Sequence, residues 1–255
     1  MTTSYATVTE LPGSGVTPEQ LSMLYTRYHL AADFGAGKDV LEVACGPGVG
    51  LSYLVRRTRS VIGGDFDRDI LRLTPQTAGV RLLQLDAQAL PFDKQSFDLV
   101  ILFEALYYLA IPEKFVAEAR RVLRPGGRVL LCTANKDAPG FNPSPYTYRY
   151  FSVPQLQALL QAGGFLPEVY GAFPVKVTTF RDRALLTARR AVVGLHLVPT
   201  TMRGKELVKR ILYRTVVPLP NALHDGMAEL HPLEQLPGDV PTTKFKVLYT
   251  VGRLP

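Results

Sequence analysis

Cysteine is scarce in this 255-residue chain, and long apolar runs are absent from it. Cys45 and Cys132 are too few for a disulfide framework or a metal-ligand cluster, so a reducing compartment is favoured and no metal site is expected. No uncharged apolar run approaches the roughly 18 residues that span a bilayer. The N-terminus lacks the basic flank and apolar stretch of a secretory signal. By elimination, we expect a cytoplasmic protein.

Acidic residues are almost missing from one segment, residues 181–215. This segment holds nine Lys or Arg but only Asp182 and Glu206, a surplus of seven that equals the formal net charge of +7 for the whole chain. The remainder of the chain is therefore close to neutral. Such a segment suits an anionic acceptor or peripheral contact with an anionic membrane surface. A solvated basic face with no partner is the alternative that the sequence leaves open.

Apolar segments alternate with helical patterns through the first half of the chain. Strands are predicted at residues 39–44, 60–64, 80–85, 97–103 and 128–133, with helices at 51–57, 67–73 and 112–123. A further helix begins after Thr17, where Thr-Pro-Glu-Gln combines a capping residue, a proline in the first turn and a capping-box partner. This alternation predicts right-handed βαβ units, and hence an α/β fold with a doubly wound, mostly parallel sheet and helices on both faces.

The pattern changes after residue 133. A loop rich in Pro and Tyr covers residues 141–151, a capped helix begins after Ser152, and strands are predicted at 166–173 and 244–253. The long insertion between these strands, residues 174–243, is expected to form a lid over the substrate site, because elaborations of this length are usually functional. We therefore expect a flexible N-terminus at 1–16 and a single domain over 17–255.

The most informative motif joins the first of these sheet strands to the next helix. Residues 40–50 read Val-Leu-Glu-Val-Ala-Cys-Gly-Pro-Gly-Val-Gly, and the following strand leads into Asp65. Glycines at such a turn let the backbone approach a ligand because they carry no Cβ. A carboxylate ending the next strand is placed to accept from ribose hydroxyls. The dinucleotide fingerprint needs a third glycine at position 51, which is Leu51. The turn therefore favours a nucleoside without phosphates.

Four motifs, in this order, carry a resemblance to a known family. They are residues 41–50, Asp65, residues 85–92 (Leu-Asp-Ala-Gln-Ala-Leu-Pro-Phe), and residues 97–100 (Phe-Asp-Leu-Val) followed by 121–127 (Arg-Val-Leu-Arg-Pro-Gly-Gly). Residues 39–135 thereby resemble the class I S-adenosylmethionine-dependent methyltransferases that act on small molecules. The resemblance implies a seven-stranded sheet of order 3-2-1-4-5-7-6 whose last strand is antiparallel.

The resemblance also implies which residues bind S-adenosylmethionine and, after transfer, S-adenosylhomocysteine. Backbone at Gly46 and Gly48 would approach the methionine moiety of the cofactor. Glu42 would support the turn and help to hold the ammonium group. Tyr28 would cover the methionine end, with packing in the core as the alternative role for its ring.

The adenosine half of the cofactor is assigned to later motifs. Asp65 would accept hydrogen bonds from the ribose hydroxyls, and Phe66 would pack against the adenine. Asp86 would accept from the adenine amino group while the Ala87 N–H donates to a ring nitrogen. Phe103 would lie beside the reacting methyl group.

Methyl transfer to oxygen usually also requires that a proton leave the acceptor. Glu104 directly follows residues 97–103, and Tyr108 lies one helical turn further along, so both are candidate catalytic residues facing the acceptor. The predicted function is methylation of a small molecule at oxygen, with a sugar-containing or lipid-linked acceptor.

Other functions stay open at this point. One is C-methylation of a quinone or other prenyl lipid at the membrane face, and another is a non-catalytic module that binds the cofactor. Basic surface also suits nucleic acid. Base-amino methyltransferases carry an Asn/Asp-Pro-Pro-aromatic turn after the fourth strand, however, and residues 103–106 read Phe-Glu-Ala-Leu. Methylation of a base amino group is thereby disfavoured, whereas RNA methylated at ribose or a ring carbon is not excluded.

Overall fold

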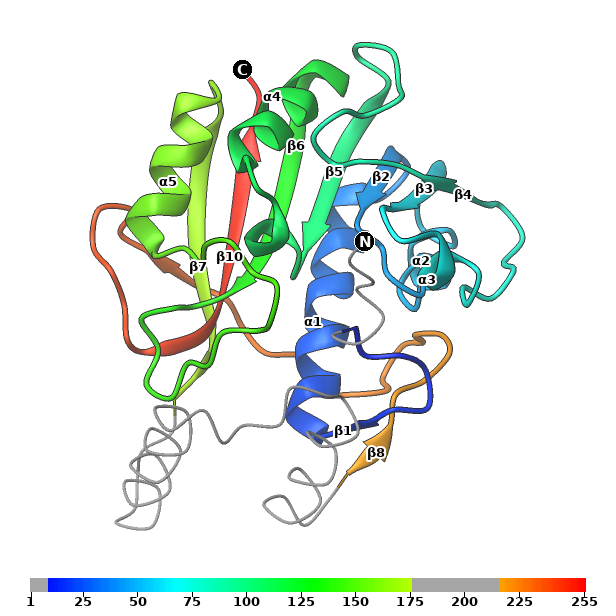
Figure 1. Cartoon of the computed structure of the whole chain (residues 1–255), viewed down its shortest axis with the longest axis horizontal. Helices are drawn as coiled ribbons and strands as arrows, with labels where there is room; N and C mark the ends of the chain where they lie inside the picture. The colour runs from blue at the N-terminus through cyan, green and yellow to red at the C-terminus, as the bar shows by residue number, and fades with distance from the viewer. Residues whose placement is uncertain (1–8, 176–215) are drawn as a thin grey trace.

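One mixed sheet forms the centre of the molecule. The computed structural model describes residues 9–175 and 216–255. The strands run in the order β4 (Val80–Gln84), β3 (Ser60–Asp65), β2 (Asp39–Val43), β5 (Phe97–Phe103), β6 (Leu123–Ala134), β10 (Phe245–Arg253), β7 (Leu166–Pro174) and β9 (Glu234–Leu236) (Figure 1). The first five are parallel, whereas β10 is antiparallel to β6 and β7. The predicted fold class and strand order are confirmed, and β9 adds an eighth strand beside β7.

Helices cover both faces of this sheet. α1 (Pro18–Gly35) and the short α2 (Leu51–Leu54) pack on one face, and α4 (Pro112–Val122) and α5 (Val153–Ala162) pack on the other. Side chains of β5 alternate between the two cores, with Ile101 on the α1 face and Leu102 on the α4 face. Because both faces of β5 are buried, its sequence is a near-continuous apolar run rather than an alternating one.

α1 begins where its cap predicts. The Gln20 N–H donates to Oγ1 of Thr17 at 3.2 Å, and the Thr17 N–H donates to Oε1 of Gln20 at 3.0 Å. This reciprocal pair satisfies two N–H groups that the first helical turn would otherwise leave without acceptors. Since the cap fixes the start of α1, it also fixes where later residues of this helix meet the sheet.

The N-terminal segment and the end of the insertion form a second, two-stranded sheet. β1 (Gly15–Val16) pairs antiparallel with β8 (Val217–Pro218), and Figure 1 shows the pair beside one end of α1. Residues 15–16, at the end of the segment predicted to be flexible, thus form a paired strand. The basic residues 181–215, to which the membrane prediction refers, lie outside the described residues.

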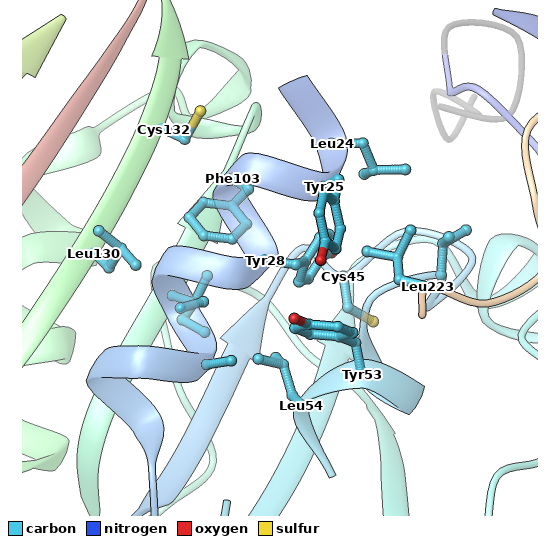
Figure 2. Packing of buried hydrophobic residues seen from close by; sticks show 14 of the residues in the cluster. Leu24, Tyr25, Tyr28, Cys45, Tyr53, Leu54, Phe103, Leu130, Cys132 and Leu223 are labelled. Atoms are coloured by element: carbon cyan, nitrogen blue, oxygen red, sulfur yellow. The ribbon is translucent and has the colours of Figure 1, made fainter. Parts of the chain in front are cut away.

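The described end of the insertion also packs along α1 and α2. The Gly226 N–H donates to the Tyr25 hydroxyl at 3.0 Å, and the Arg56 guanidinium donates to the Leu223 carbonyl at 2.8 Å. Figure 2 shows Tyr25, Tyr53 and Leu223 gathered at this junction. This part of the 174–243 insertion thus holds the two helices together.

An ion cluster lies at the amino ends of the central strands. The Arg124 guanidinium lies 2.9 Å from Asp98 and 3.0 Å from Asp39, and Arg59 pairs with the same two carboxylates. Both arginines therefore connect β2 to β5 at the amino-terminal edge of the sheet. Open α/β sheets bind ligands at the opposite edge, beyond the carboxyl ends of the strands.

Three further features bear on function. Among the described helices, none is long and apolar enough to cross a bilayer. Cys45 and Cys132 are both buried and form no disulfide. Within the described ranges, no group of three or more His, Cys, Asp or Glu side chains is placed to hold a metal ion.

Candidate active site

The glycine turn after β2 needs glycine for two different reasons. Gly46 and Gly48 adopt φ values of 57° and 67°, in the left-handed region that favours glycine. A Cβ on Gly48 would also lie 2.3 Å from the Thr74 methyl carbon, whereas among the described residues a Cβ on Gly46 would meet only Thr9, at 3.8 Å. The backbone of Gly46 is therefore the more openly approachable of the two.

Asp65 ties this turn to the end of β3. Its Oδ2 accepts from the Gly46 N–H at 2.8 Å, and its Oδ1 accepts from the Asp67 N–H at 2.9 Å. The side chain is buried. Burial raises the pKa of the Asp65 carboxyl, while the N–H groups of Asp67 and Gly46 act in the opposite direction. Each oxygen retains a lone pair, so the carboxylate can accept further hydrogen bonds.

The Glu42 carboxyl is buried behind the turn. Its Oε1 accepts from the Tyr28 hydroxyl at 2.5 Å, while its Oε2 has no hydrogen-bond partner among the described residues. Burial raises the pKa of Glu42 to about 7, against the opposing effects of the Tyr28 hydroxyl and of Arg27. An interior carboxylate oxygen without a donor is unusual and marks a place for a ligand or a water.

The residues predicted to contact adenosine lie at neighbouring strand ends. β3 and β4 are adjacent, and the Leu85 N–H donates to the Asp65 carbonyl at 3.0 Å just before Asp86. Phe66 is 51% exposed, an unusual state for a large aromatic ring. The Asp86 carboxylate accepts from the Gln88 N–H at 2.8 Å, and the intervening Ala87 is buried. Asp65, Phe66 and Asp86 therefore belong to one edge of the site.

A second carboxylate stands at the end of β5. Phe103 is buried, with its ring edge-on to Tyr28 at a centroid distance of 5.4 Å. The next residue, Glu104, has a φ of 52°, which costs a side chain other than glycine roughly 1–3 kcal/mol. Its N–H donates to the Cys132 carbonyl at 2.8 Å, which holds this strained conformation. Strain of this kind often accompanies a functional residue.

Three residues that the sequence did not single out for this position surround the Glu104 carboxyl. The Tyr107 hydroxyl donates to Oε2 at 3.0 Å, Arg27 lies 3.8 Å from Oε1, and the Cys132 thiol lies 3.6 Å from Oε1. Burial raises the pKa of Glu104, and the Arg27 charge acts most strongly in the opposite direction. Arg27 directly precedes Tyr28 on α1, and this adjacency is the signal in the sequence that could have identified it.

Tyr108 lies beyond the carboxyl and faces the Pro- and Tyr-rich loop. Its hydroxyl donates to Oγ of Ser144 at 2.9 Å. Its neighbour Tyr107 stacks on Tyr150 at a centroid distance of 4.4 Å, and Phe141 meets Tyr150 edge-on at 4.6 Å. The phenol bonded to Glu104 is therefore Tyr107, and Tyr108 belongs to an aromatic cluster beside it.

Comparison with known proteins relates this chain to methyltransferases. Residues 41–131 match the model of a methyltransferase domain. The chain is 33% identical over 152 residues to a protein of Mycolicibacterium smegmatis named as a probable S-adenosylmethionine-dependent methyltransferase, covering 57% of this chain and 59% of that protein. It is 42% identical over 109 residues to the phthiotriol/phenolphthiotriol dimycocerosates methyltransferase of Mycobacterium tuberculosis, covering 41% and 40%.

A further relative and a solved structure extend these matches. The fatty-acid O-methyltransferase of Mycolicibacterium smegmatis is 42% identical over 103 residues, or 38% of each chain. The chain thus spans less than two thirds of the length of each of these relatives. A crystal structure of a methyltransferase from Thermotoga maritima, named as a possible histamine N-methyltransferase, superposes with a TM-score of 0.60 at 14% identity, covering 93% and 92% of the two chains. These matches confirm the resemblance seen in the sequence: residues 41–131 match a methyltransferase domain, and the chain has the fold of the class I S-adenosylmethionine-dependent methyltransferases.

Proposed function

We propose that this protein transfers the methyl group of S-adenosylmethionine to an oxygen atom of a lipid or lipid-linked acceptor. The observation that carries the proposal is the half-buried Glu104 carboxyl at the carboxyl end of β5, held by Arg27 and Tyr107. On a methyltransferase domain, this position is where a group that removes a proton from the acceptor belongs.

The residues around the glycine turn fit the cofactor. The unpartnered Oε2 of Glu42 would accept from the ammonium group, and the backbone at Gly46 and Gly48 would pass along the methionine moiety. The free lone pairs of Asp65 would accept from the ribose hydroxyls. The buried orphan oxygen is the strongest of these observations, because the bound ammonium would satisfy it.

The adenine would lie beside the exposed Phe66 ring. Asp86 and the Ala87 backbone would recognise its edge, and Phe103 would face the sulfur end of the cofactor. When bound, the cofactor supplies a methyl group on a cationic sulfur that is already activated toward displacement. The tasks of the chain are to orient the acceptor and to move its proton.

Glu104 would take that proton. When the acceptor oxygen receives the methyl group, the bond from the methyl carbon to sulfur would break and release S-adenosylhomocysteine, and the O–H proton of the acceptor would pass to the Glu104 carboxylate. The raised pKa of Glu104 makes it a stronger base than an exposed carboxylate, and the Arg27 charge lowers that pKa against the effect of burial. The aromatic cluster of Tyr107, Tyr108, Phe141 and Tyr150 would line the approach of the acceptor.

A lipid acceptor is supported by the relatives and by the site. Two of the three relatives described above are named for lipid acceptors, a phthiotriol derivative and a fatty acid. The aromatic cluster offers apolar surface beside Glu104, and Tyr146 and Tyr148 of the same loop are 55% and 68% exposed. The basic residues 181–215 would bring the protein to an anionic membrane surface that carries such an acceptor.

The direct test uses radiolabelled S-adenosylmethionine and a panel of acceptors. Long-chain secondary alcohols, fatty acids and quinols are incubated with the wild-type protein, and products are identified by mass spectrometry and NMR. We expect an O-methyl ether of a lipid alcohol, and its formation should be lost in Glu104→Gln. A carbon-methylated quinol would support the alternative function instead. No affinity for S-adenosylhomocysteine in calorimetry would refute both.

Membrane contact is tested separately. Sedimentation with vesicles containing anionic lipid should retain the protein at low salt and release it at high salt, because interactions between exposed charges are screened. Neutral vesicles are the matched control. Equal recovery in the supernatant with both vesicle types would contradict the membrane role of residues 181–215.

A further inference from the structure

Gly50 and the Tyr28 ring occupy adjoining space. A Cβ built on Gly50 would lie 1.9 Å from Cε1 of Tyr28 and 2.0 Å from its Cζ. Gly50 itself has φ −86° and ψ −17°, a right-handed conformation that alanine adopts without strain. Backbone conformation therefore gives no reason for glycine at this position. The reason is the tyrosine ring that packs against it.

The same tyrosine connects three parts of the site. Its ring lies against the glycine turn at Gly50 and edge-on to Phe103 of β5. Figure 2 shows Phe103 beside α1, the helix that carries Tyr28. Its hydroxyl donates to Glu42 at the end of β2. Because the ring is buried and contacts two elements, the hydroxyl is held in place rather than free to rotate away.

The hydrogen bond leaves Glu42 with one engaged and one open oxygen. Oε1 is occupied by Tyr28, whereas Oε2 is buried with no partner among the residues that the structure describes. A carboxylate anchored at one oxygen presents the other in a defined direction. An acceptor that is buried and preoriented in this way binds a cationic donor strongly, since no rotamer freedom is lost when the donor arrives.

We infer that Tyr28 is a positioning residue: by packing on Gly50 and bonding Oε1 of Glu42, it directs Oε2 of Glu42 toward the ammonium group of the cofactor. The inference rests on the proposed function, because it requires S-adenosylmethionine at this turn. It divides the three glycines by task. Gly46 and Gly48 shape the backbone that faces the ligand, and Gly50 makes room for Tyr28.

A pH dependence follows from the surroundings of Glu42. The titratable or charged groups that act on it are Tyr28 and Arg27 of α1, Asp65 of β3 and Cys45 of the turn. With its pKa raised to about 7, Glu42 is only partly ionised near neutrality. Because the ammonium group binds to the ionised form, cofactor affinity should increase between pH 6 and pH 8. Removing the Tyr28 hydroxyl takes away a hydrogen bond that lowers this pKa, so the increase should move to higher pH.

The test compares two ligands and three proteins by titration calorimetry. S-Adenosylhomocysteine carries the ammonium group, whereas 5′-methylthioadenosine keeps the adenosine and sulfur but lacks it. The proteins are wild type, Tyr28→Phe and the control Tyr25→Phe, which removes another buried hydroxyl from the same helix. In Tyr28→Phe we expect roughly a tenfold or greater rise in Kd for S-adenosylhomocysteine at pH 7, with Kd for 5′-methylthioadenosine unchanged within twofold. Tyr25→Phe should change neither.

Three results would overturn the inference. The first is an equal loss of affinity for both ligands in Tyr28→Phe, because a purely structural role would give that result. The second is unchanged binding of S-adenosylhomocysteine in this variant. The third is a pH dependence of its Kd identical to that of wild type. A wild-type protein that binds neither ligand would instead defeat the proposed function.

A second variant keeps the inference testable if Tyr28→Phe is poorly folded. Gly50→Ala adds one methyl group against the Tyr28 ring without straining the backbone, so it should displace the hydroxyl from Glu42. We expect the same selective loss of S-adenosylhomocysteine binding. In a Glu42→Gln background, adding Tyr28→Phe should cause no further loss. Independent, additive effects in this double variant would contradict a role exerted through Glu42.

Discussion

Arg27 and Tyr28, consecutive on α1, serve two different carboxylates. Arg27 lies 3.8 Å from Glu104 at the end of β5, and the Tyr28 hydroxyl lies 2.5 Å from Glu42 at the end of β2. Consecutive residues of a helix point about 100° apart, so a single helix reaches two neighbouring strand ends. α1 thereby supports both the proposed cofactor contact and the proposed base. Substitution of Tyr28 should affect cofactor binding, and substitution of Arg27 should affect turnover.

Glu104→Gln should reduce turnover without weakening cofactor binding. The amide keeps the size of the side chain but cannot take a proton from the acceptor, and general bases typically contribute about 10²–10⁴-fold to a rate. We expect a fall of this order in kcat, with Kd for S-adenosylhomocysteine within twofold of wild type. Steady-state kinetics and calorimetry on the same preparation measure both. A parallel loss of binding would show that Glu104 supports the cofactor instead.

Arg27→Gln should move the acid limb of the rate profile. Glu104 must be ionised to act as a base, so activity rises with pH as this raised pKa is passed. The Arg27 charge lowers that pKa against the effect of burial. Without the charge the pKa of Glu104 increases, and the acid limb of kcat should shift to higher pH. The kcat profile of Tyr25→Phe provides the comparison, and coincident profiles would rule out this coupling.

Asp65→Ala should weaken cofactor binding at least tenfold. The substitution removes the proposed acceptor for the ribose hydroxyls and also releases the N–H groups of Gly46 and Asp67. Asp69→Ala is the control, because among the described residues that carboxylate pairs only with Arg72, in an exposed ion pair. Calorimetry with S-adenosylhomocysteine measures the Kd of both variants and of wild type. An affinity equal to wild type in Asp65→Ala would remove Asp65 from the site.

The strands were predictable wherever the sheet buries both of their faces. β5 spans Phe97–Phe103, as its apolar run predicts, and α1 begins at its capping box. The short strands β1, β8 and β9 carry no such pattern. Each has two or three residues and exists because a distant segment offers unpaired backbone groups. Local sequence does not encode a partner of that kind.

The residues of the candidate site also differ in how far the local sequence predicts them. Glu42 and Asp65 follow from a motif in which strand and turn are contiguous. The relation of Glu104 to its phenol was missed because an α-helix was assumed, which favours residues four apart such as Tyr108. The segment Leu106–Tyr108 is a 3₁₀ helix. Glu104 lies before this helix and has a left-handed φ of 52°, so helical spacing does not determine which phenol it meets. The Tyr107 hydroxyl is the one that donates to it.

The ion cluster at the amino ends of the strands should make stability acid-sensitive. Hydrogen bonds from Arg59, with support from Ser60 and Arg124, lower the pKa of Asp39 against a smaller effect of burial. A lowered pKa in the folded state adds stability above the unfolded value, about 4, that is lost as pH falls toward the folded value. Asp39→Asn should lower the free energy of unfolding by about 1–3 kcal/mol at pH 7. The difference in this free energy between the variant and wild type should become smaller as pH falls from 5 to 3.

Urea denaturation across that pH range measures the effect. Asp69→Asn, at an exposed pair with Arg72, should change the free energy of unfolding by less than about 0.5 kcal/mol. A constant difference between Asp39→Asn and wild type at all pH values would contradict the assignment of the acid dependence to this carboxylate.

Asp225 should hold the end of the insertion against α2. Its carboxylate accepts from the Tyr53 hydroxyl at 2.8 Å and from the Arg57 guanidinium at 2.7 Å and 2.6 Å. Asp225→Ala removes these contacts while leaving the Gly226 contact to Tyr25 in place. Hydrogen exchange followed by mass spectrometry should then show faster exchange in residues 219–231, with the sheet unchanged. Glu234→Gln, which weakens an exposed pair with Lys244, should leave these residues as protected as in wild type. Faster exchange in both variants would mean that any lost surface charge loosens the segment, and unchanged exchange in Asp225→Ala would mean that the packing of Leu219 and Leu223 alone holds it.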